Sequence, residues 1–189
     1  METHAAEMNA AFTLMEEEKF QEAMALYQKL SALGLVEADV AIADMYQNGR
    51  GVDVNIDRAE EIYINAAATG NIWAEYTLAC FYEETERDEL AIPILRELAC
   101  EQHLASLNRL GRFLQYGLGC EVDPAGALRF RNAAADQGHI WALKWRALRY
   151  LKGENGNLKR LYAFFVYARA FSIIFRCVFF YPGDPRLSE

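Results

Sequence analysis

The sequence has few of the residues on which metal sites and disulfide frameworks depend. Its 189 residues include three histidines, four cysteines and four prolines. The first residues, from Met1 to Glu7, lack the basic and apolar regions of a signal peptide. We therefore expect a cytoplasmic chain whose cysteines are thiols. Low proline and glycine content and 53% apolar residues exclude a disordered or collagen-like chain and favour a globular core.

Positive charge is scarce in the first part of the chain. Residues 1–104 hold about 6 Lys and Arg against about 21 Asp and Glu, whereas residues 105–189 hold about 13 against about 6. The net charge of -8 argues against binding of nucleic acid over the whole surface, which needs a basic field. The uneven distribution predicts an electrostatic dipole.

No group of residues has the pattern of a reaction centre. The histidines, His4, His103 and His139, have no second metal ligand at helical spacing. The glycine pairs in 49–51 and 117–119 lack the Lys-Ser/Thr that follows a phosphate-binding loop. We therefore predict no catalytic residue, no metal ion and no cofactor, and we interpret His139 as a solvated corner between repeats.

The sequence repeats itself after 68 residues. Gly70-Asn-Ile-Trp-Ala74 matches Gly138-His-Ile-Trp-Ala142, and the glycine pair at 49 and 51 matches the pair at 117 and 119. Small residues also recur in pairs that are 12 or 16 residues apart: Ala11 and Ala23, Ala43 and Ala59, Ala79 and Ala91, Gly111 and Ala127, Ala147 and Ala163. Because small side chains let two helices pack closely, the pairs predict an all-α fold, an α-solenoid of about five helix-turn-helix repeats in a right-handed superhelix.

The repeat frame sets the predicted boundaries. The repeats cover about 6–34, 38–72, 73–104, 106–140 and 142–171, within one domain of residues 1–181 that ends in an apolar extension, 172–181, before a tail, 182–189. Four extra residues lengthen the loops of the second, fourth and fifth repeats, where glycine tolerates the left-handed backbone of a tight turn. Asp57 is predicted to cap the helix that follows the first of these loops.

The order of motifs resembles a known repeat. A small residue followed by Tyr46, then Gly-x-Gly-Val-x-Val, Ala-Ala-x-x-Gly and Trp-Ala, is similar to the Sel-one-like repeat of the tetratricopeptide superfamily. The second and fourth repeats fit best, and the first and third look like plain tetratricopeptide repeats. The resemblance implies a non-catalytic adaptor or scaffold that binds another protein, of unknown identity, in the concave groove of the solenoid.

The same resemblance implies which residues line the groove, because the first helix of each repeat forms its inner wall. The predicted partner contacts are Asp44, Gln47, Asn48, Tyr76, Glu83, Asn108, Arg112, Gln115, Tyr116 and Lys144, with Met8, Phe12, Met15, Val40 and Glu84 beside them. Their character changes along the chain from apolar through acidic to basic, which would orient a ligand by its charge. We interpret Trp73, Trp141 and Trp145 as core residues at the joints between repeats.

The segment from Leu158 to Tyr181 is long and apolar enough to span a bilayer, but Arg169 and Arg176 inside it oppose insertion. The apolar end of this segment is expected to be buried against another surface. That surface could be its own last hairpin, a second copy of the chain, a membrane interface or a partner protein. The predicted contacts there are Arg169, Phe175, Arg176, Phe179 and Phe180. A peripheral membrane protein is therefore the alternative function, and an accessory module of an enzyme also stays open.

Overall fold

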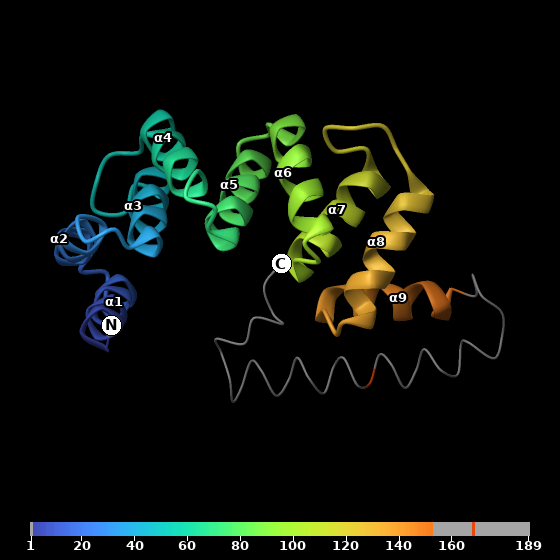
Figure 1. Ribbon diagram of the computed structural model, residues 1–189, viewed down its shortest axis with the longest axis horizontal. Helices are drawn as coiled ribbons and strands as arrows, with labels where there is room; N and C mark the ends of the chain where they lie inside the picture. Colours follow the sequence, from blue (N-terminus) through green and yellow to red (C-terminus); the bar gives the residue numbers. More distant parts are fainter. Residues whose placement is uncertain (1, 153–167, 169–189) are drawn as a thin grey trace. The chain divides into compact units, whose positions relative to one another are not determined.

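The computed structural model describes residues 2–152 and residue 168, and the regular structure in those residues is entirely α-helical (Figure 1). The described helices are α1 (Glu2–Glu16), α2 (Phe20–Ser31), α3 (Val36–Asn48), α4 (Ile56–Ala67), α5 (Ile72–Glu84), α6 (Asp88–Cys100), α7 (Leu104–Tyr116), α8 (Pro124–Asp136) and α9 (Ile140–Leu151). The predicted all-α fold is confirmed. The predicted contacts Arg169, Phe175, Arg176, Phe179 and Phe180 lie outside the described residues, as do Ala163 and the apolar extension.

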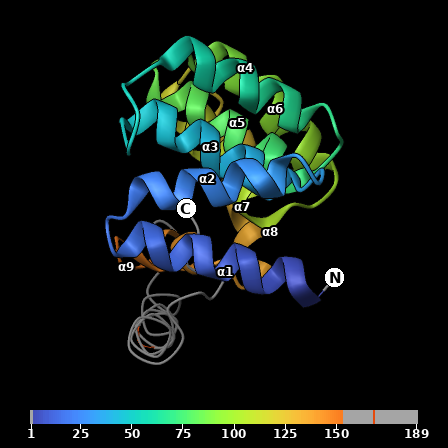
Figure 2. The same cartoon turned by 90° about the vertical axis from the view of Figure 1, so that its left-hand side faces the viewer.

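These helices fall into two compact units. The first ends at Glu86 and contains α1 to α5, and the second begins at Arg87 and contains α6 to α9. Inside each unit, every helix packs against the next one along the chain, as Figure 2 shows for α1, α2 and α3. The hairpins α1–α2 and α3–α4 therefore stack within the first unit, and α7–α8 stacks between α6 and α9 within the second.

The predicted small residues form the closest parts of this packing. Seven of the alanines, Ala11, Ala23, Ala43, Ala59, Ala79, Ala91 and Ala147, are completely buried, and Ala127 is 2% exposed. Gly111 is also buried, and a Cβ added there would collide with Cγ of Arg131 on α8. Within the units, these small residues lie on packed pairs of helices for Ala11 and Ala23, Ala43 and Ala59, and Gly111 and Ala127, in agreement with the prediction.

The glycine pairs do more than turn the chain. Gly49 and Gly117 end α3 and α7 with left-handed backbone, at φ 68° and φ 70°. Gly51 lies against the start of α2, where an added Cβ would be 2.6 Å from Cβ of Phe20. Gly119 lies in the same way against the start of α6, where an added Cβ would be 2.5 Å from the backbone nitrogen of Glu89. The second glycine therefore lets each long loop touch the helix that precedes its own hairpin, α2 in the first unit and α6 in the second.

The start of α4 corrects one prediction. The side chain of Asn55 accepts a hydrogen bond from the backbone nitrogen of Arg58 at 2.9 Å, so Asn55 is the N-cap. Asp57, which was predicted to cap this helix, lies within its first turn. The predicted cap lies two residues too late in the sequence. A capping side chain must precede the helix so that its oxygen can reach the first free backbone amides.

His139 corrects a second prediction. Its side chain is completely buried, whereas a solvated corner was predicted. The ring atom Nδ1 accepts a hydrogen bond from the backbone nitrogen of Ala142 at 3.3 Å and so caps α9. Asn71, at the matching position one 68-residue repeat earlier, caps α5 by accepting from Trp73 and Ala74. The histidine therefore replaces an asparagine cap.

A stabilising substitution is suggested by the connections between hairpins. Gly34, Gly70 and Gly138 have φ between 76° and 94°, and Gln102 occupies the matching position with φ 63°. A side chain in this left-handed region costs about 1–2 kcal/mol, more than glycine loses in conformational entropy. We expect Gln102→Gly to raise the free energy of unfolding in urea by about 0.5–1 kcal/mol. Glu101→Gly, at a neighbour with φ −78°, should lower that free energy; equal changes would contradict the argument.

Candidate functional site

The first unit contains a largely apolar groove of about 470 Å³ that is lined mainly by the first helices α1, α3 and α5. Its lining residues are Met8, Asn9, Phe12, Met15, Tyr27, Glu37, Val40, Ala41, Asp44, Arg50, Tyr63, Trp73 and Thr77. The structure thus brings together Met8, Phe12, Met15, Val40 and Asp44, as the groove prediction placed them. The wall of the groove therefore combines apolar side chains with the carboxylate of Asp44.

Trp73 differs from its prediction. It was interpreted as a core residue at a joint, but its side chain is 47% exposed and lines the groove. Phe12 on α1 is 59% exposed and lines the same groove. Large apolar side chains that stay exposed in a concave surface mark an interaction site more often than isolated exposed leucines do.

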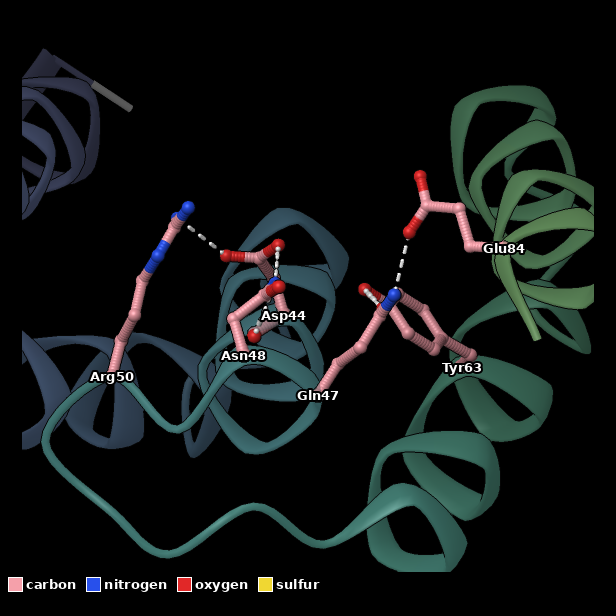
Figure 3. A network of polar contacts seen from close by, with 6 residues as sticks. All are labelled: Asp44, Gln47, Asn48, Arg50, Tyr63 and Glu84. Atoms are coloured by element: carbon pink, nitrogen blue, oxygen red, sulfur yellow. Dashed lines mark hydrogen bonds and ion pairs between the residues drawn. The ribbon is translucent and has the colours of Figure 1, made fainter.

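Asp44 is an acidic group of the groove, and its neighbours hold it in place (Figure 3). Its Oδ2 forms an ion pair with Nη1 of Arg50 at 2.9 Å, and its Oδ1 accepts a hydrogen bond from Nδ2 of Asn48 at 2.8 Å. Burial raises the pKa of Asp44, Glu84 raises it further, and Arg50 and Asn48 act in the opposite direction. Asn48 is therefore a support for Asp44 in this structure.

Gln47 connects three helices beside Asp44 (Figure 3). The hydroxyl of Tyr63 on α4 donates to Oε1 of Gln47 at 3.1 Å, and Nε2 of Gln47 donates to Oε2 of Glu84 on α5 at 2.6 Å. Burial raises the pKa of Tyr63, and the negative charges of Asp44 and Glu84 add to this effect. Tyr63 thus stays a neutral hydrogen-bond donor, and the network fixes the spacing of α3, α4 and α5.

The structure places the two predicted contacts on α5 away from the groove. Tyr76 is 8% exposed, Glu83 is partly buried, and neither lines it. Trp73 and Thr77, one helical turn apart, take that place on α5. Sequence reasoning missed this face because tryptophan was assigned to the core, although Trp73 and Thr77 match Glu37 and Ala41, which line the groove from α3.

The second unit contains a basic and aromatic pocket of about 320 Å³. Its lining residues are Asn108, Arg109, Arg112, Arg131, Trp141, Lys144, Trp145 and Leu148, and none of these is acidic. The structure therefore brings together the predicted contacts Asn108, Arg112 and Lys144. The tryptophans of α9, which were interpreted as core residues, are partly buried and also line this pocket, and Nζ of Lys144 lies 4.9 Å from the ring centroid of Trp141.

An adjacent pocket of about 420 Å³ contains the remaining predicted contacts, Gln115 and Tyr116. It shares Trp145 and Leu148 with the basic pocket. Tyr116 is 62% exposed, so its ring is accessible to a ligand. The predicted contacts of α7 and α9 therefore surround one stretch of surface in the second unit.

Arg131 and Arg109 line this surface but were not predicted from the sequence, and Arg131 is the more buried of the two. It lies on α8, a second helix, and is 8% exposed. Its Nη1 donates to Oε1 of Gln115 at 2.8 Å, and its Cζ lies 4.2 Å from the ring centroid of Trp145. Burial lowers the pKa of Arg131 to about 10, with Tyr116 acting against this and the positive charges of Arg112 and Arg149 adding to it.

Two other kinds of site are absent from the described part of the chain. Residues 2–152 hold no group of three or more His, Cys, Asp or Glu side chains that could bind a metal ion. No helix in that range is both long enough and apolar enough to cross a bilayer.

Comparison with known proteins agrees with the repeat architecture. The Sel1 repeat model matches residues 16–35, 36–71 and 104–139. The chain is also 26% identical over 149 residues to chitin synthase regulatory factor 3 of Schizosaccharomyces pombe. That match covers 72% of this chain but only 16% of the yeast protein, so the chain spans about one sixth of that relative.

Solved structures show the same fold at low sequence identity. A Sel1 repeat protein from Oxalobacter formigenes is 21% identical, with a TM-score of 0.69 and coverage of 90% of this chain and 74% of that one. A Pseudomonas aeruginosa protein is also 21% identical, with a TM-score of 0.61 and coverage of 89% and 66%. Together with the nine described helices, these likenesses identify the fold as an α-solenoid.

Proposed function

Because the chain carries Sel1 repeats, we propose that it is a non-catalytic adaptor that binds a partner protein through the groove of its first unit. The observation that carries the proposal is the exposure of Phe12 and Trp73 in one concave surface. Burial of such aromatic side chains at the centre of an interface supplies most of the binding free energy in many complexes.

The groove also indicates the chemistry of the partner. Its wall is apolar and contains Met8 and Met15, which adapt to the shape of a ligand because their side chains are flexible. Glu37 and Asp44 give it two carboxylates, of which Asp44 is paired with Arg50. A helical or extended segment with apolar residues and a neighbouring basic residue would complement this surface.

The comparisons support a binding role without defining the partner. Sel1 repeat proteins generally mediate protein–protein interaction, and the fold is typically a non-catalytic scaffold. The yeast relative is named as a regulatory factor of chitin synthase, which accords with a protein that acts on another by binding it. The proposal for this chain therefore rests on its own groove.

Site-specific photocrosslinking in cells that express the protein would test the groove. With p-benzoylphenylalanine at position 12 or 73, we expect covalent capture of the same partner from both positions. The reason is that both side chains line one groove. The same amino acid at Ile64, an exposed residue of α4 that does not line the groove, is the control.

A loss-of-binding experiment completes the test. Phe12→Ser and Trp73→Ser should each lower the amount of captured partner about tenfold or more, because each removes a large apolar contact. Ile64→Ser should leave capture unchanged. Equal capture by all three variants, or crosslinking at position 64 alone, would show that the groove of the first unit is not the binding surface.

A further inference from the structure

The second unit contains a buried cation that lacks a negative counterpart among the described residues. Arg131 is more than nine-tenths buried, and the ionisable groups that act on it in that part of the chain are Tyr116, Arg112 and Arg149, none of them a carboxylate. Its Nε has no hydrogen-bond partner there. A buried guanidinium without a paired anion is costly, so the folded protein retains it at the expense of stability.

A second buried polar residue lines the same pocket and, within the described part of the chain, also lacks a hydrogen-bond partner for one of its atoms. Asn108 on α7 is 8% exposed, and its Oδ1 has no hydrogen-bond partner among the described residues. Together, Asn108 and Arg131 give the pocket an unused acceptor and an unused donor. Buried polar groups without a partner are rare in folded proteins, and a ligand that carries both a negatively charged acceptor and an N–H donor would supply partners for both residues.

The charged residues that line the pocket are all cations. Arg109, Arg112 and Lys144 line it in addition to Arg131, and its aromatic residues are Trp141 and Trp145. Trp145 contacts two guanidinium groups, those of Arg131 at 4.2 Å and Arg149 at 4.9 Å. Stacking on aromatic rings keeps arginine side chains extended and ordered, and this prepares them to bind carboxylates.

We propose that this pocket binds an acidic peptide segment of a protein partner, with Asp or Glu side chains held among Arg109, Arg112, Arg131 and Lys144. A peptide supplies backbone N–H groups as well as carboxylates, which suits both Asn108 and the arginines. The inference rests on the proposed binding of a protein, but it concerns the second unit and residues that the groove of the first unit does not contain.

Charge and size favour a peptide over a nucleic acid. The net charge of the chain is -8, and this opposes the approach of a long polyanion. The cations gather in one pocket of about 320 Å³, whereas a nucleic-acid strand requires a basic stripe along its backbone. A short acidic segment needs only the local positive charge.

The test titrates the full chain with a hexaglutamate peptide that is acetylated and amidated at its ends, in 150 mM salt. Calorimetry would give the stoichiometry, and the indole N–H signals in NMR spectra would report the location. We expect one peptide per chain and shifts of the Trp141 and Trp145 signals, with that of Trp73 unchanged. Hexaglutamine and hexalysine peptides should not bind.

Matched variants make the test specific. Arg112→Gln and Lys144→Gln should each weaken hexaglutamate binding about threefold to tenfold, and the double variant more than tenfold. Arg129→Gln, at an exposed arginine of α8 that does not line the pocket, should change the affinity less than twofold. The circular dichroism spectra of all variants should match that of the parent, so that a loss of binding cannot reflect unfolding.

Several outcomes would overturn the proposal. These are the absence of hexaglutamate binding, an equal effect of Arg129→Gln, or tighter binding of a thymidine hexanucleotide or of inorganic phosphate to the same residues. Any of these results would leave the photocrosslinking test of Phe12 and Trp73 unaffected, because that test uses the first unit. Failure at position 12 or 73 would equally leave hexaglutamate binding to be measured in the second unit.

Discussion

Replacement of Gly119 by alanine is expected to lower the free energy of unfolding of the second unit by about 3 kcal/mol. Two effects combine, because Gly119 has left-handed backbone with φ 60° and its α-carbon faces the backbone of Asp88 and Glu89. A side chain in the left-handed backbone conformation costs about 1–2 kcal/mol. The close contact of the added Cβ with fixed backbone atoms costs about 1–3 kcal/mol more. Urea denaturation followed by circular dichroism would measure the change.

Gly138 provides the control for backbone strain alone. It lies in the same unit at φ 94°, and an added Cβ would have no neighbour within 4 Å. Gly138→Ala should therefore cost about 1 kcal/mol, and the difference from Gly119→Ala measures the close approach of the loop to α6. Gly51→Ala should repeat the larger loss in the first unit, where the neighbour is Phe20. Equal losses at 119 and 138 would mean that the loop can move away.

The glycine pairs illustrate how far the sequence determines the fold. Their 68-residue spacing predicts two long loops with left-handed turns, and φ at Gly49 and Gly117 agrees. The contact of the second glycine with the helix before its own hairpin could not be predicted, because it depends on how that helix stacks on the hairpin. The length of a repeat depends on the helices and loop inside that repeat. The residues that a loop contacts in a neighbouring helix depend on how the repeats stack.

The small residues were predictable for a related reason. Ala43 and Ala59 must both be small for α3 and α4 to approach each other, so the constraint acts inside one hairpin and appears in the sequence. His139 and Trp73 were placed wrongly because residue type alone guided their interpretation. A histidine can cap a helix from a buried position, as His139 does, and a tryptophan can stay exposed in a binding surface, as we propose for Trp73.

The candidate sites could be predicted from the sequence in part. First-helix positions such as Val40 and Asp44 follow from the repeat frame, and the basic character of α7 and α9 follows from the charge distribution. Arg131 was missed because it lies on a second helix, which the frame assigns to the outer layer. Its position matches that of Tyr63 one 68-residue repeat earlier, and both side chains reach back across their hairpins to a glutamine, Gln115 or Gln47.

That correspondence also explains Gly111. The stem of Arg131 occupies the space that a Cβ at position 111 would need, whereas the matching residue of the other hairpin is Ala43, opposite Tyr63. The stem of Arg131 is thus part of the packing of α7 against α8. Methionine has an unbranched side chain that can follow Cβ and Cγ of this stem, and it removes the charge and the hydrogen bond to Gln115.

Arg131→Met is therefore expected to raise the free energy of unfolding by about 2 kcal/mol at pH 7, because it replaces a buried, uncompensated cation with an apolar side chain of similar path. The thioether should keep a contact with Trp145, and Gln115, which is only partly buried, can turn toward water. Urea denaturation would measure the gain. Arg129→Met, at an exposed position of the same helix, should change the free energy by less than about 0.5 kcal/mol.

The same variant should bind the hexaglutamate peptide at least tenfold more weakly than the parent chain, since the central cation of the pocket is gone. A gain in stability together with a loss of binding would show that the charge is kept for its ligand, because a residue selected for stability alone would behave in the opposite way. A less stable Arg131→Met variant would instead mean that the hydrogen bond to Gln115 and the stacking on Trp145 outweigh the cost of burying the guanidinium.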